Sequence, residues 1–444
     1  MRCPMGVQLV AWIGLVGCGG KAVDSASPSD DTIDLPTSTC GGTYDWLGRS
    51  EVGSIVAYEP LPDFSIDQAA VQGLMAVAGA TDTSEARFGV QVGRVRYTTQ
   101  DRGVLTEATA LVAWPDTTGP VDSLLYLHPA TGLEDFCAPS GRDLIWAGVP
   151  IVLASMGYAV AAPDYLGQNG FGDEATELHP YLTAEPTAVA SLDALRALWA
   201  LSPDDTSAGV TPGTRTLILG ASQGGGAAFW AERYAQEYLP EANLIGTVST
   251  VPLMDVYSWA VESAAALTVG SVGVPIMLET SAQWYGLDAD ISEVIPSSEV
   301  DRLYTAFETE CPEAALPDDV TTLDDVYTTD WQTALAAGTA PEPCDCMLRE
   351  NSPATAPVGR GAEVPAFVII GGADDVALTS QSRATVDALC ADGHPVVAVE
   401  CNGLGHEDTV QATLDLTLDA LRLFEVGEQP EGEVCGTIQT MDCG

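Results

Sequence analysis

Lysine is almost missing from this chain of 444 residues, and histidine is scarce: the only lysine is Lys21, and there are four histidines. Because Lys21 precedes the expected folded part, that part cannot carry a Schiff base, a P-loop lysine or a Ser-Lys dyad. Basic residues number 16 against 63 acidic ones, which gives a formal net charge of −47. A charge of this sign repels phosphate backbones, so the sequence predicts no nucleic-acid partner.

Long hydrophobic runs are missing as well. The run from Val7 to Val16 follows Arg2 and is too short to span a bilayer, which is typical of a targeting segment. Residues 15–18 read Leu-Val-Gly-Cys and resemble the lipobox of bacterial lipoproteins, in which Cys18 becomes the lipidated first residue. The alternative is an ordinary secretory signal in which Cys18 falls by chance.

We therefore expect residues 1–18 to be a lipoprotein-type signal peptide. Residues 19–43 are rich in Gly, Ser, Asp and Pro and are expected to form a flexible tether. The protein is then an exported bacterial lipoprotein, anchored to a membrane at the cell envelope or cell surface only through this N-terminal lipid; otherwise it is secreted. We expect a monomer.

Eleven cysteines fit export to an oxidising compartment. Cys3 leaves with the leader and Cys18 would carry the lipid, which leaves an odd number and at least one unpaired thiol. Cys344 and Cys346 form a CxC without further cysteines or histidines at zinc spacing, so disulfides are favoured over a metal site. The other cysteines are Cys40, Cys137, Cys311, Cys390, Cys401, Cys435 and Cys443.

Strands and helices alternate along most of the chain. Short β segments at Ser54–Tyr58, Phe88–Tyr97 and Leu105–Trp114 come first and are expected to be partly antiparallel. The later alternation predicts a mostly parallel central sheet flanked by helices. The expected later strands cover residues 123–127, 158–162, 216–219, 244–251, 364–370 and 396–400, and the expected helices cover 186–201, 223–238, 381–391 and 408–424.

A long stretch interrupts this alternation. We expect residues 253–360 to be a largely helical cap, or lid, inserted between sheet strands 6 and 7 above the carboxyl edge of the sheet. The alternative is a small domain remote from the site. The core then consists of residues 44–252 and 361–426, and a cysteine-containing tail follows at 427–444.

Residues 214–226 combine an apolar run, a GxSxG pentapeptide around Ser222 and helix-forming sequence. This predicts a strand, a sharp turn that carries the serine, and a helix, which together are the nucleophile elbow of an α/β-hydrolase. Gly220 and Gly224 lack side chains where strand and helix nearly touch. Because glycine is abundant here, the pentapeptide alone is a weak signal, and its surroundings must support the interpretation.

A serine nucleophile needs a base and an acid behind that base, all at the carboxyl edge of the sheet. His406 follows the last expected strand, whereas His394 precedes it, so His406 is the predicted base. For the acid we prefer Asp374, because the pattern glycine, small residue, aspartate and a hydrophobic residue two positions on resembles the acid loop of many α/β-hydrolases. Asp375 and Glu400 stay open as alternatives.

Attack on a carbonyl creates an oxyanion that needs two backbone donors. One is the N–H of Gln223, directly after the serine. The other is expected from residues 128–132, which read His-Pro-Ala-Thr-Gly. Pro129 has no N–H, so the donor is Ala130 or Thr131; alternatively, the segment is only a turn.

Two further segments face the same edge. Asp164 lies in residues 162–167, which read Ala-Pro-Asp-Tyr-Leu-Gly, and its strand precedes that of Ser222, which favours a structural hydrogen-bond acceptor over a catalytic acid. His179 opens the sequence His-Pro-Tyr-Leu, which either lines the pocket or orders a loop.

Together these segments resemble the secretory lipase family, which comprises fungal secreted lipases and bacterial esterases of the α/β-hydrolase superfamily. The resemblance covers about residues 45–425. It implies an α/β-hydrolase fold and cleavage of carboxylic esters, including acylglycerols, through an acyl-serine intermediate without a cofactor, beneath a cap. The sequence departs from the family pattern at Pro129, where a glycine is usual, so the resemblance does not extend to the shape of that loop.

We therefore expect an esterase or triacylglycerol lipase that acts on small-molecule or lipid esters and needs no metal. One alternative is a proline-directed peptidase of the same fold. Another is a non-catalytic tethered binding lipoprotein on a hydrolase scaffold. The chain order Ser222, Asp374, His406 argues against the second alternative.

Overall fold

The computed structural model describes residues 38, 40, 46–201, 209–287, 291–296, 311, 319–358 and 364–443, all within one compact unit. Cys18 and the expected signal peptide lie outside the described residues, as does most of the expected tether. The domain boundaries expected from the sequence therefore stay predictions.

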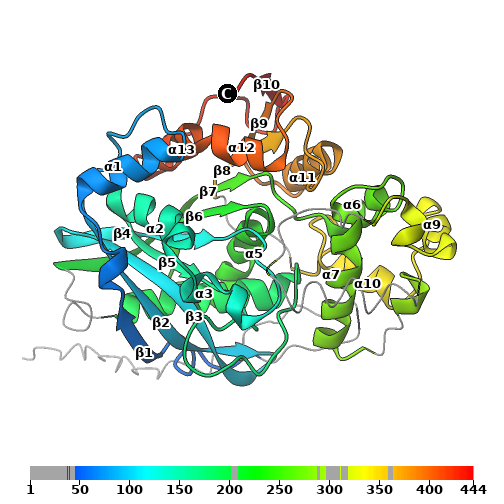
Figure 1. The fold of residues 1–444 in the computed structure, drawn as a ribbon, viewed down its shortest axis with the longest axis horizontal. Helices are drawn as coiled ribbons and strands as arrows, with labels where there is room; N and C mark the ends of the chain where they lie inside the picture. The colour runs from blue at the N-terminus through cyan, green and yellow to red at the C-terminus, as the bar shows by residue number, and fades with distance from the viewer. Residues whose placement is uncertain are drawn as a thin grey trace, which may run out of the picture. The chain divides into compact units, whose positions relative to one another are not determined.

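A ten-stranded sheet organises the described chain in the order β1-β2-β3-β5-β4-β6-β7-β8-β9-β10 (Figure 1). The antiparallel pairs are β1 with β2, β2 with β3, and β3 with β5, and every other neighbouring pair is parallel. The strands are β1 (Ile55–Pro60), β2 (Val90–Asp101), β3 (Val104–Pro115), β4 (Thr118–Leu127), β5 (Ala159–Pro163), β6 (Gly209–Ala221), β7 (Asn243–Thr250), β8 (Ala366–Gly371), β9 (Val396–Cys401) and β10 (Gln439–Met441). This confirms the mostly parallel sheet with antiparallel early strands.

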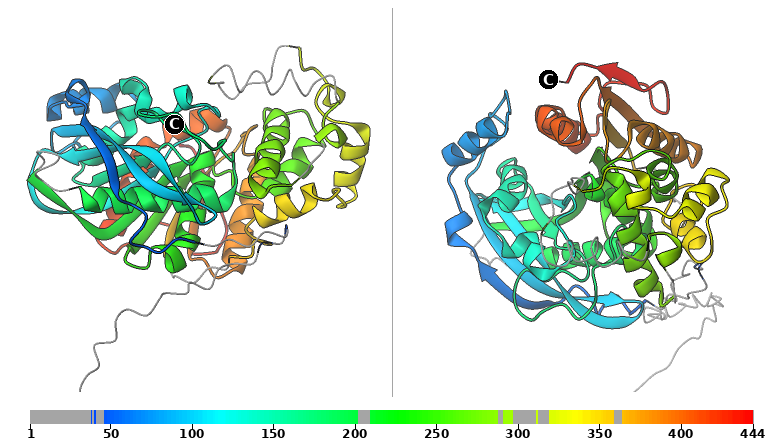
Figure 2. Two further views of the ribbon diagram at one scale, coloured as in Figure 1. Left: turned by 90° about the horizontal axis from the view of Figure 1, so that it is seen from below. Right: turned by 45° about the vertical axis from the view of Figure 1, so that its right-hand side comes forward.

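Helices cover both faces of this sheet (Figures 1 and 2). On one face, α3 (Ala184–Ala200), α5 (Gln223–Tyr238) and α11 (Thr379–Ala391) share a hydrophobic core with the strands. On the other face, a second core joins the strands to α1 (Gln68–Val77), α2 (Leu144–Ser155) and α13 (Leu414–Glu425). Helices on both faces of a mostly parallel sheet make this an α/β fold, as expected from the sequence.

The expected helix over residues 408–424 is in fact two helices, α12 (His406–Ala412) and α13, with a break at Thr413. The reason lies in the packing, since α12 contacts β8, whereas α13 lies against β6 and β7. The break at Thr413 thus separates a helix that contacts β8 from one that packs on β6 and β7.

The described residues of the long insertion are largely helical. They form α6 (Val256–Ser263), α7 (Gly270–Tyr285), α9 (Thr329–Ala336) and α10 (Cys344–Glu350), which lie between β7 and β8. These two strands correspond to the strands expected at residues 244–251 and 364–370, on either side of the insertion. Their buried side chains share a third hydrophobic core with Leu182, before α3, and Ala377, after β8. In Figure 1 these helices run from green to yellow beside the sheet. The insertion therefore packs on loops that adjoin the carboxyl edge, and its function as a cap stays a prediction.

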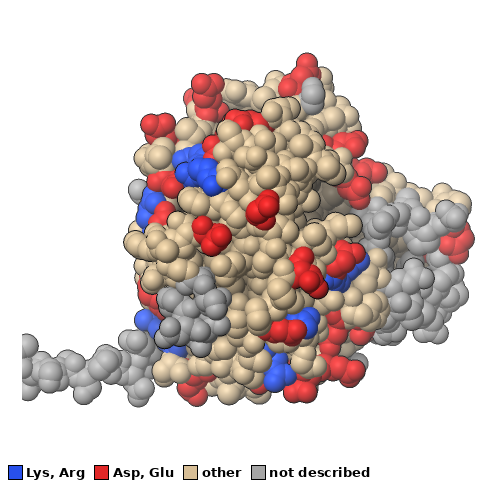
Figure 3. All heavy atoms as spheres, turned by 60° about the vertical axis from the view of Figure 1, so that its left-hand side comes forward, with Lys and Arg blue, Asp and Glu red and all other residues tan. Residues whose placement is uncertain are grey.

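On the face of the molecule in Figure 3, acidic side chains are scattered among uncharged ones and outnumber the basic side chains. Many described arginines form ion pairs with carboxylates and so neutralise part of the acidic charge: Arg94, Arg96, Arg102, Arg196, Arg215, Arg233, Arg349, Arg383 and Arg422. Within the described ranges, no helix combines the length and apolarity needed to cross a bilayer.

Four disulfides join the described cysteines: Cys40–Cys346, Cys137–Cys311, Cys390–Cys435 and Cys401–Cys443. Among those cysteines, Cys344 is left as a buried thiol, and burial raises its pKa to about 12. The expected unpaired thiol is thus confirmed. Of the two cysteines in the CxC, Cys346 forms a disulfide, which agrees with the preference for disulfides over a metal site.

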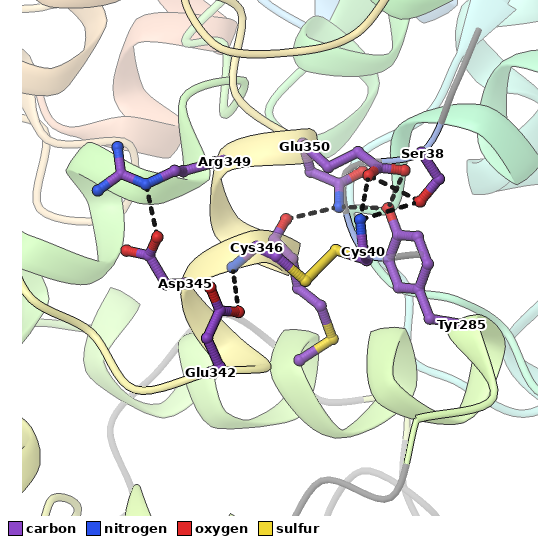
Figure 4. Close-up of a disulfide and its surroundings, with 10 residues drawn as sticks. Ser38, Cys40, Tyr285, Glu342, Asp345, Cys346, Arg349 and Glu350 are labelled. Atoms are coloured by element: carbon purple, nitrogen blue, oxygen red, sulfur yellow. Dashed lines mark hydrogen bonds and ion pairs between the residues drawn. A yellow bond between two sulfur atoms is a disulfide. The ribbon is translucent and has the colours of Figure 1, made fainter. Parts of the chain in front are cut away.

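The disulfide between Cys40 and Cys346 fastens the N-terminal side of the fold to helix α10 (Figure 4). Hydrogen bonds to one carboxylate of α10 reinforce this link. Glu350 Oε2 accepts from Ser38 Oγ at 2.9 Å and from the Cys40 N–H at 3.1 Å, while Glu350 Oε1 accepts from the Tyr285 hydroxyl at 3.1 Å. The chain before β1 is therefore attached to the insertion far along the sequence.

Candidate active site

The predicted catalytic residues follow three strands that end at one edge of the sheet. Ser222 follows β6, and Asp374 and His406 follow β8 and β9. The register of parallel pairs places Ala221 opposite Thr250 and Gly371 opposite Cys401, so these strand ends lie side by side. Loops at the carboxyl edge of such a sheet are where α/β proteins build their sites.

The turn at Ser222 is strained and tightly packed. Ser222 has φ +55° and ψ −121°, which a non-glycine residue adopts only when its surroundings impose it. A Cβ added at Gly220 would lie 2.0 Å from the carbonyl oxygen of Gly224, and one added at Gly224 would lie 2.0 Å from that of Leu127. Both glycines of the GxSxG pattern are thus required by close backbone approaches, as the sequence predicted.

The structure brings the three predicted catalytic side chains into a hydrogen-bonded chain. His406 Nε2 lies 2.8 Å from Ser222 Oγ, and His406 Nδ1 lies 2.8 Å and 3.0 Å from the two carboxyl oxygens of Asp374. Asp374 Oδ1 also accepts the N–H groups of Val376 and Ala377, at 2.9 Å each. A carboxylate held in this way accepts a hydrogen bond from the N–H at Nδ1, which leaves Nε2 free to accept a hydrogen bond from the serine hydroxyl.

The alternative residues are engaged elsewhere. Asp375 is exposed, and Glu400 accepts two hydrogen bonds from Arg383 at 2.6 Å and 2.7 Å. His394 is buried at the amino end of β9, with its Nε2 3.2 Å from Glu232 Oε2. In the described structure, only Asp374 of the three acids is bonded to His406.

The loop after β4 lies next to the start of α5, because Leu127 is opposite Gly220 in the sheet. Gln223 is the first residue of α5, and the first N–H groups of a helix have no partner within it. In the loop, Ala130 is exposed and Thr131 is buried. Ala130 or Thr131 as the second donor stays a prediction, as does the alternative that the segment is only a turn.

Asp164 acts as a buried structural acceptor, in agreement with its predicted role. Its carboxylate accepts from the Thr109 hydroxyl at 2.5 Å and from the Ser140 N–H at 2.8 Å, and the Ser140 hydroxyl also bonds to it. Burial is the largest influence on this carboxyl group and raises its pKa to about 6. The bonds join β3, η3 (Pro139–Gly141) and the segment after β5 beneath the site.

Sequence reasoning left the role of His179 open, and the structure places it against Gln223, the first residue of the helix that follows the serine. His179 Nε2 lies 3.2 Å from the side-chain nitrogen of Gln223, and His179 Nδ1 lies 2.9 Å from the carbonyl oxygen of Leu166. Burial lowers the pKa of His179 to about 4. The sequence marks the histidine, but no local pattern could identify a partner 44 residues away.

The described residues offer no group of three or more His, Cys, Asp or Glu side chains suited to a metal ion. The side chains that meet at this edge are a serine hydroxyl, an imidazole that can accept its proton, and a carboxylate behind that imidazole. This constellation activates a serine as a nucleophile in acyl transfer.

A family model described as secretory lipase matches residues 149–285. The matched part contains β6, Ser222 and α5 and ends before Asp374 and His406. It confirms the resemblance stated from the sequence for this stretch of the chain. No curated protein matches the chain.

Several solved structures are similar. The rice cell wall degrading esterase LipA from Xanthomonas oryzae is 18% identical with a TM-score of 0.63, over 83% of this chain and 96% of that one. Candida antarctica lipase A in its closed state is 18% identical with a TM-score of 0.62, over 92% and 89% of the two chains. A putative hydrolase from Legionella pneumophila is 17% identical with a TM-score of 0.68, over 85% and 100%. At these identities the likeness shows the α/β-hydrolase fold.

Proposed function

We propose that this protein is a serine hydrolase that cleaves carboxylic esters, as an esterase or triacylglycerol lipase. The observation that carries the proposal is the hydrogen-bonded chain from Asp374 through His406 to Ser222 on a strained elbow. The family match around Ser222 and the esterase and lipase among the similar structures point to the same substrate class.

In the first half of the reaction, Ser222 Oγ attacks the ester carbonyl carbon while His406 Nε2 takes the hydroxyl proton. The carbonyl π electrons move to the oxygen, which becomes an oxyanion in a tetrahedral intermediate. When this intermediate collapses, the bond to the alcohol oxygen breaks and His406 returns the proton to the departing alkoxide. An alcohol leaves, and the acyl group stays on Ser222.

In the second half, a water molecule takes the place of the alcohol. His406 Nε2 accepts a proton from this water as its oxygen bonds to the acyl carbon, and then returns the proton to Ser222 Oγ as the acid is released. Asp374 orients the imidazole and stabilises its protonated form throughout. Its fixed position, with two backbone N–H groups on one oxygen, supports this function.

The oxyanion is stabilised by two backbone donors in this proposal. One is the N–H of Gln223 at the start of α5, where the helix dipole also favours negative charge. The other is the N–H of Ala130 or Thr131. The close packing of Gly224 on the carbonyl groups of Leu127 and His128 supports a fixed distance between the two donor segments.

We further propose that the protein is exported, lipidated at Cys18 and monomeric. The four disulfides support export, since such bonds persist in oxidising compartments. Expression in a bacterial host with a radiolabelled fatty acid tests the anchor. Label in the wild type but not in Cys18→Ser supports it, and equal label in both contradicts it.

A substrate panel tests the activity. p-Nitrophenyl esters of increasing acyl length and proline-containing peptide substrates are offered to the wild type and to Ser222→Ala. We expect ester cleavage by the wild type and a loss of about 10⁶-fold in kcat for the variant. Cleavage of the peptides alone would favour a proline-directed peptidase, and cleavage of neither class a binding protein. Ester cleavage that persists in Ser222→Ala would overturn the mechanism.

A further inference from the structure

Three buried aromatic rings form a stack beside the candidate active site. His128, Tyr165 and His179 are all at most 3% exposed. The ring centroids of His128 and Tyr165 are 4.2 Å apart with planes inclined by 33°, and those of Tyr165 and His179 are 5.9 Å apart with planes inclined by 12°. The stack joins the ends of β4 and β5 to the segment before α3.

One end of the stack is bonded to the residue after the serine. A carbonyl oxygen only accepts, so the bond to Leu166 requires the proton of His179 on Nδ1. Nε2 is then an acceptor, and the side-chain N–H of Gln223 donates to it at 3.2 Å. Because burial keeps His179 neutral around pH 7, this donor and acceptor pattern persists there.

The other end is bonded to the loop that is expected to supply the second oxyanion donor. The Tyr165 hydroxyl donates to the carbonyl oxygen of His128 at 2.8 Å, and His128 Nδ1 donates to the carbonyl oxygen of Pro129 at 2.7 Å. A Cβ added at Gly224 would lie 2.7 Å from the same His128 oxygen. The stack thus contacts the backbone of His128 and Pro129, which Ala130 and Thr131 follow directly in the chain.

The backbone that carries the stack is held in an uncommon conformation. Tyr165 has φ +73°, a backbone conformation that is unfavourable for a residue with a Cβ. Gly167 has φ +80°, and a Cβ there would lie 2.4 Å from the backbone nitrogen of His179. Such strain persists only where the surrounding structure imposes it, which is common at functional sites. The segment after β5 is shaped so that Tyr165 reaches His128 and the chain at His179 passes close by.

We propose that His179 is a positioning residue that, through Gln223 on one side and Tyr165 on the other, fixes the two segments expected to supply the oxyanion donors. This inference rests on the proposed ester hydrolysis and adds to it. The donors stabilise charge that develops only after attack, so a small displacement of either segment raises the energy of the transition state more than that of the bound ester.

The test compares variants of His179 by kinetics. His179→Phe keeps a ring for the stack but cannot accept from Gln223. We expect its kcat on a p-nitrophenyl ester to fall about 10- to 100-fold with KM changed less than about twofold, somewhat less than the loss of a whole oxyanion donor. An aliphatic boronic acid, which forms a tetrahedral adduct on the serine, should bind correspondingly more weakly. His179→Gln, which retains an acceptor, should recover much of kcat.

A double-mutant cycle identifies the path of the effect. Gln223→Leu removes the side-chain donor but keeps the backbone N–H. If His179 acts through Gln223, the double variant should lose little more kcat than either single variant, whereas independent losses would multiply. His394→Phe is the matched control, because it also replaces a buried histidine, but one at the amino end of β9.

The outcomes separate this inference from the proposed function. If the wild type cleaves no ester, the proposed function fails, and this inference fails with it. If the wild type is active, kcat of folded His179→Phe near that of the wild type contradicts the positioning role alone. Equal losses of kcat in His179→Phe and His394→Phe, together with equal losses of stability, would indicate a merely structural histidine and also contradict it.

Discussion

Asp374 and Asp375 are adjacent carboxylates in different surroundings. Asp374 is buried against His406, whereas Asp375 is exposed. We expect Asp374→Asn to lower kcat about 10³- to 10⁴-fold, because an amide no longer favours the required tautomer of His406 or stabilises its protonated form. Asp375→Asn, the same change one residue on, should stay within about twofold of the wild type. Steady-state kinetics on one ester measures both, and the reverse pattern would assign the acid to Asp375.

Glu185 gives stability a dependence on pH that the sequence alone does not suggest. This carboxyl is 4% exposed, its Oε1 accepts from the Trp46 indole at 2.8 Å, and burial raises its pKa to about 8. Folding therefore favours the protonated form. The resulting contribution to stability is complete below the ordinary pKa of about 4.5 and is lost as the pH rises towards 8.

Glu185→Gln tests this dependence. We expect the variant to be more stable than the wild type at pH 8 by about 2–5 kcal/mol, because no buried charge forms, and to differ little at pH 4.5. Urea unfolding across this pH range measures the free energy of unfolding. Glu428→Gln, at an exposed glutamate, is the control and should follow the wild type. A Glu185→Gln variant without a pH-dependent gain contradicts the assignment.

Single residues could be predicted where strand polarity decides. The preference for His406 over His394 followed from which end of a strand each occupies, whereas Asp374 was preferred because its loop pattern resembles the acid loop of many α/β-hydrolases. The partners of His179 and Glu185 could not be predicted, because they belong to other segments: Gln223 Nε2 lies on α5, and the Trp46 indole precedes β1. Local patterns carry no information about such pairs.

The nucleophile elbow depends on the absence of a side chain at Gly224. A Cβ there would meet the Leu127 carbonyl oxygen at 2.0 Å, which is backbone and cannot move away cheaply. We expect Gly224→Ala to lose most ester hydrolysis and at least about 2 kcal/mol of stability.

Gly73 provides the matched control for that substitution. It lies within α1 with nothing within 4 Å of an added Cβ, so Gly73→Ala should raise the free energy of unfolding by about 0.5–1 kcal/mol and leave kcat unchanged. Thermal or urea unfolding and kinetics on both variants make the comparison. If Gly224→Ala behaved like Gly73→Ala, the close approach at the elbow would be refuted.

Helices and strands could be predicted where the hydrophobic periodicity was strong. The prediction failed where packing against other segments decided the structure. The sequence indicated α5 with the bounds that the structure has, and the core strands to within a few residues, apart from longer starts of β4 and β6. It missed α2, whose sequence is apolar nearly all round and contains Pro150. It also missed β10, which pairs with β9 where a disulfide joins Cys401 to Cys443.

The link between the N-terminal segment and the insertion should contribute much to overall stability. Cys40 and Cys346 are 306 residues apart, whereas Cys401 and Cys443 are 42 apart. Because a disulfide restricts the unfolded chain more when it closes a longer loop, the first bond should stabilise more. The contribution of each bond is about 2–5 kcal/mol.

Double variants test this expectation. Cys40→Ser/Cys346→Ser removes both sulfurs, so that the nearby thiol of Cys344 gains no new partner. We expect a larger loss in the free energy of urea unfolding than in Cys401→Ser/Cys443→Ser, and faster proteolysis before β1. An equal or smaller loss would show that the long connection adds nothing to the constraint on the unfolded chain.

The order of residue types along the chain was enough to predict an α/β-hydrolase sheet, the elbow at Ser222 and the strand ends that carry Asp374 and His406. These features follow from local periodicity, glycine positions and strand polarity, all of which are written in neighbouring residues. The disulfide pairing, the break between α12 and α13 and the stack around Tyr165 needed the folded molecule, because each depends on side chains that meet across segments distant in sequence.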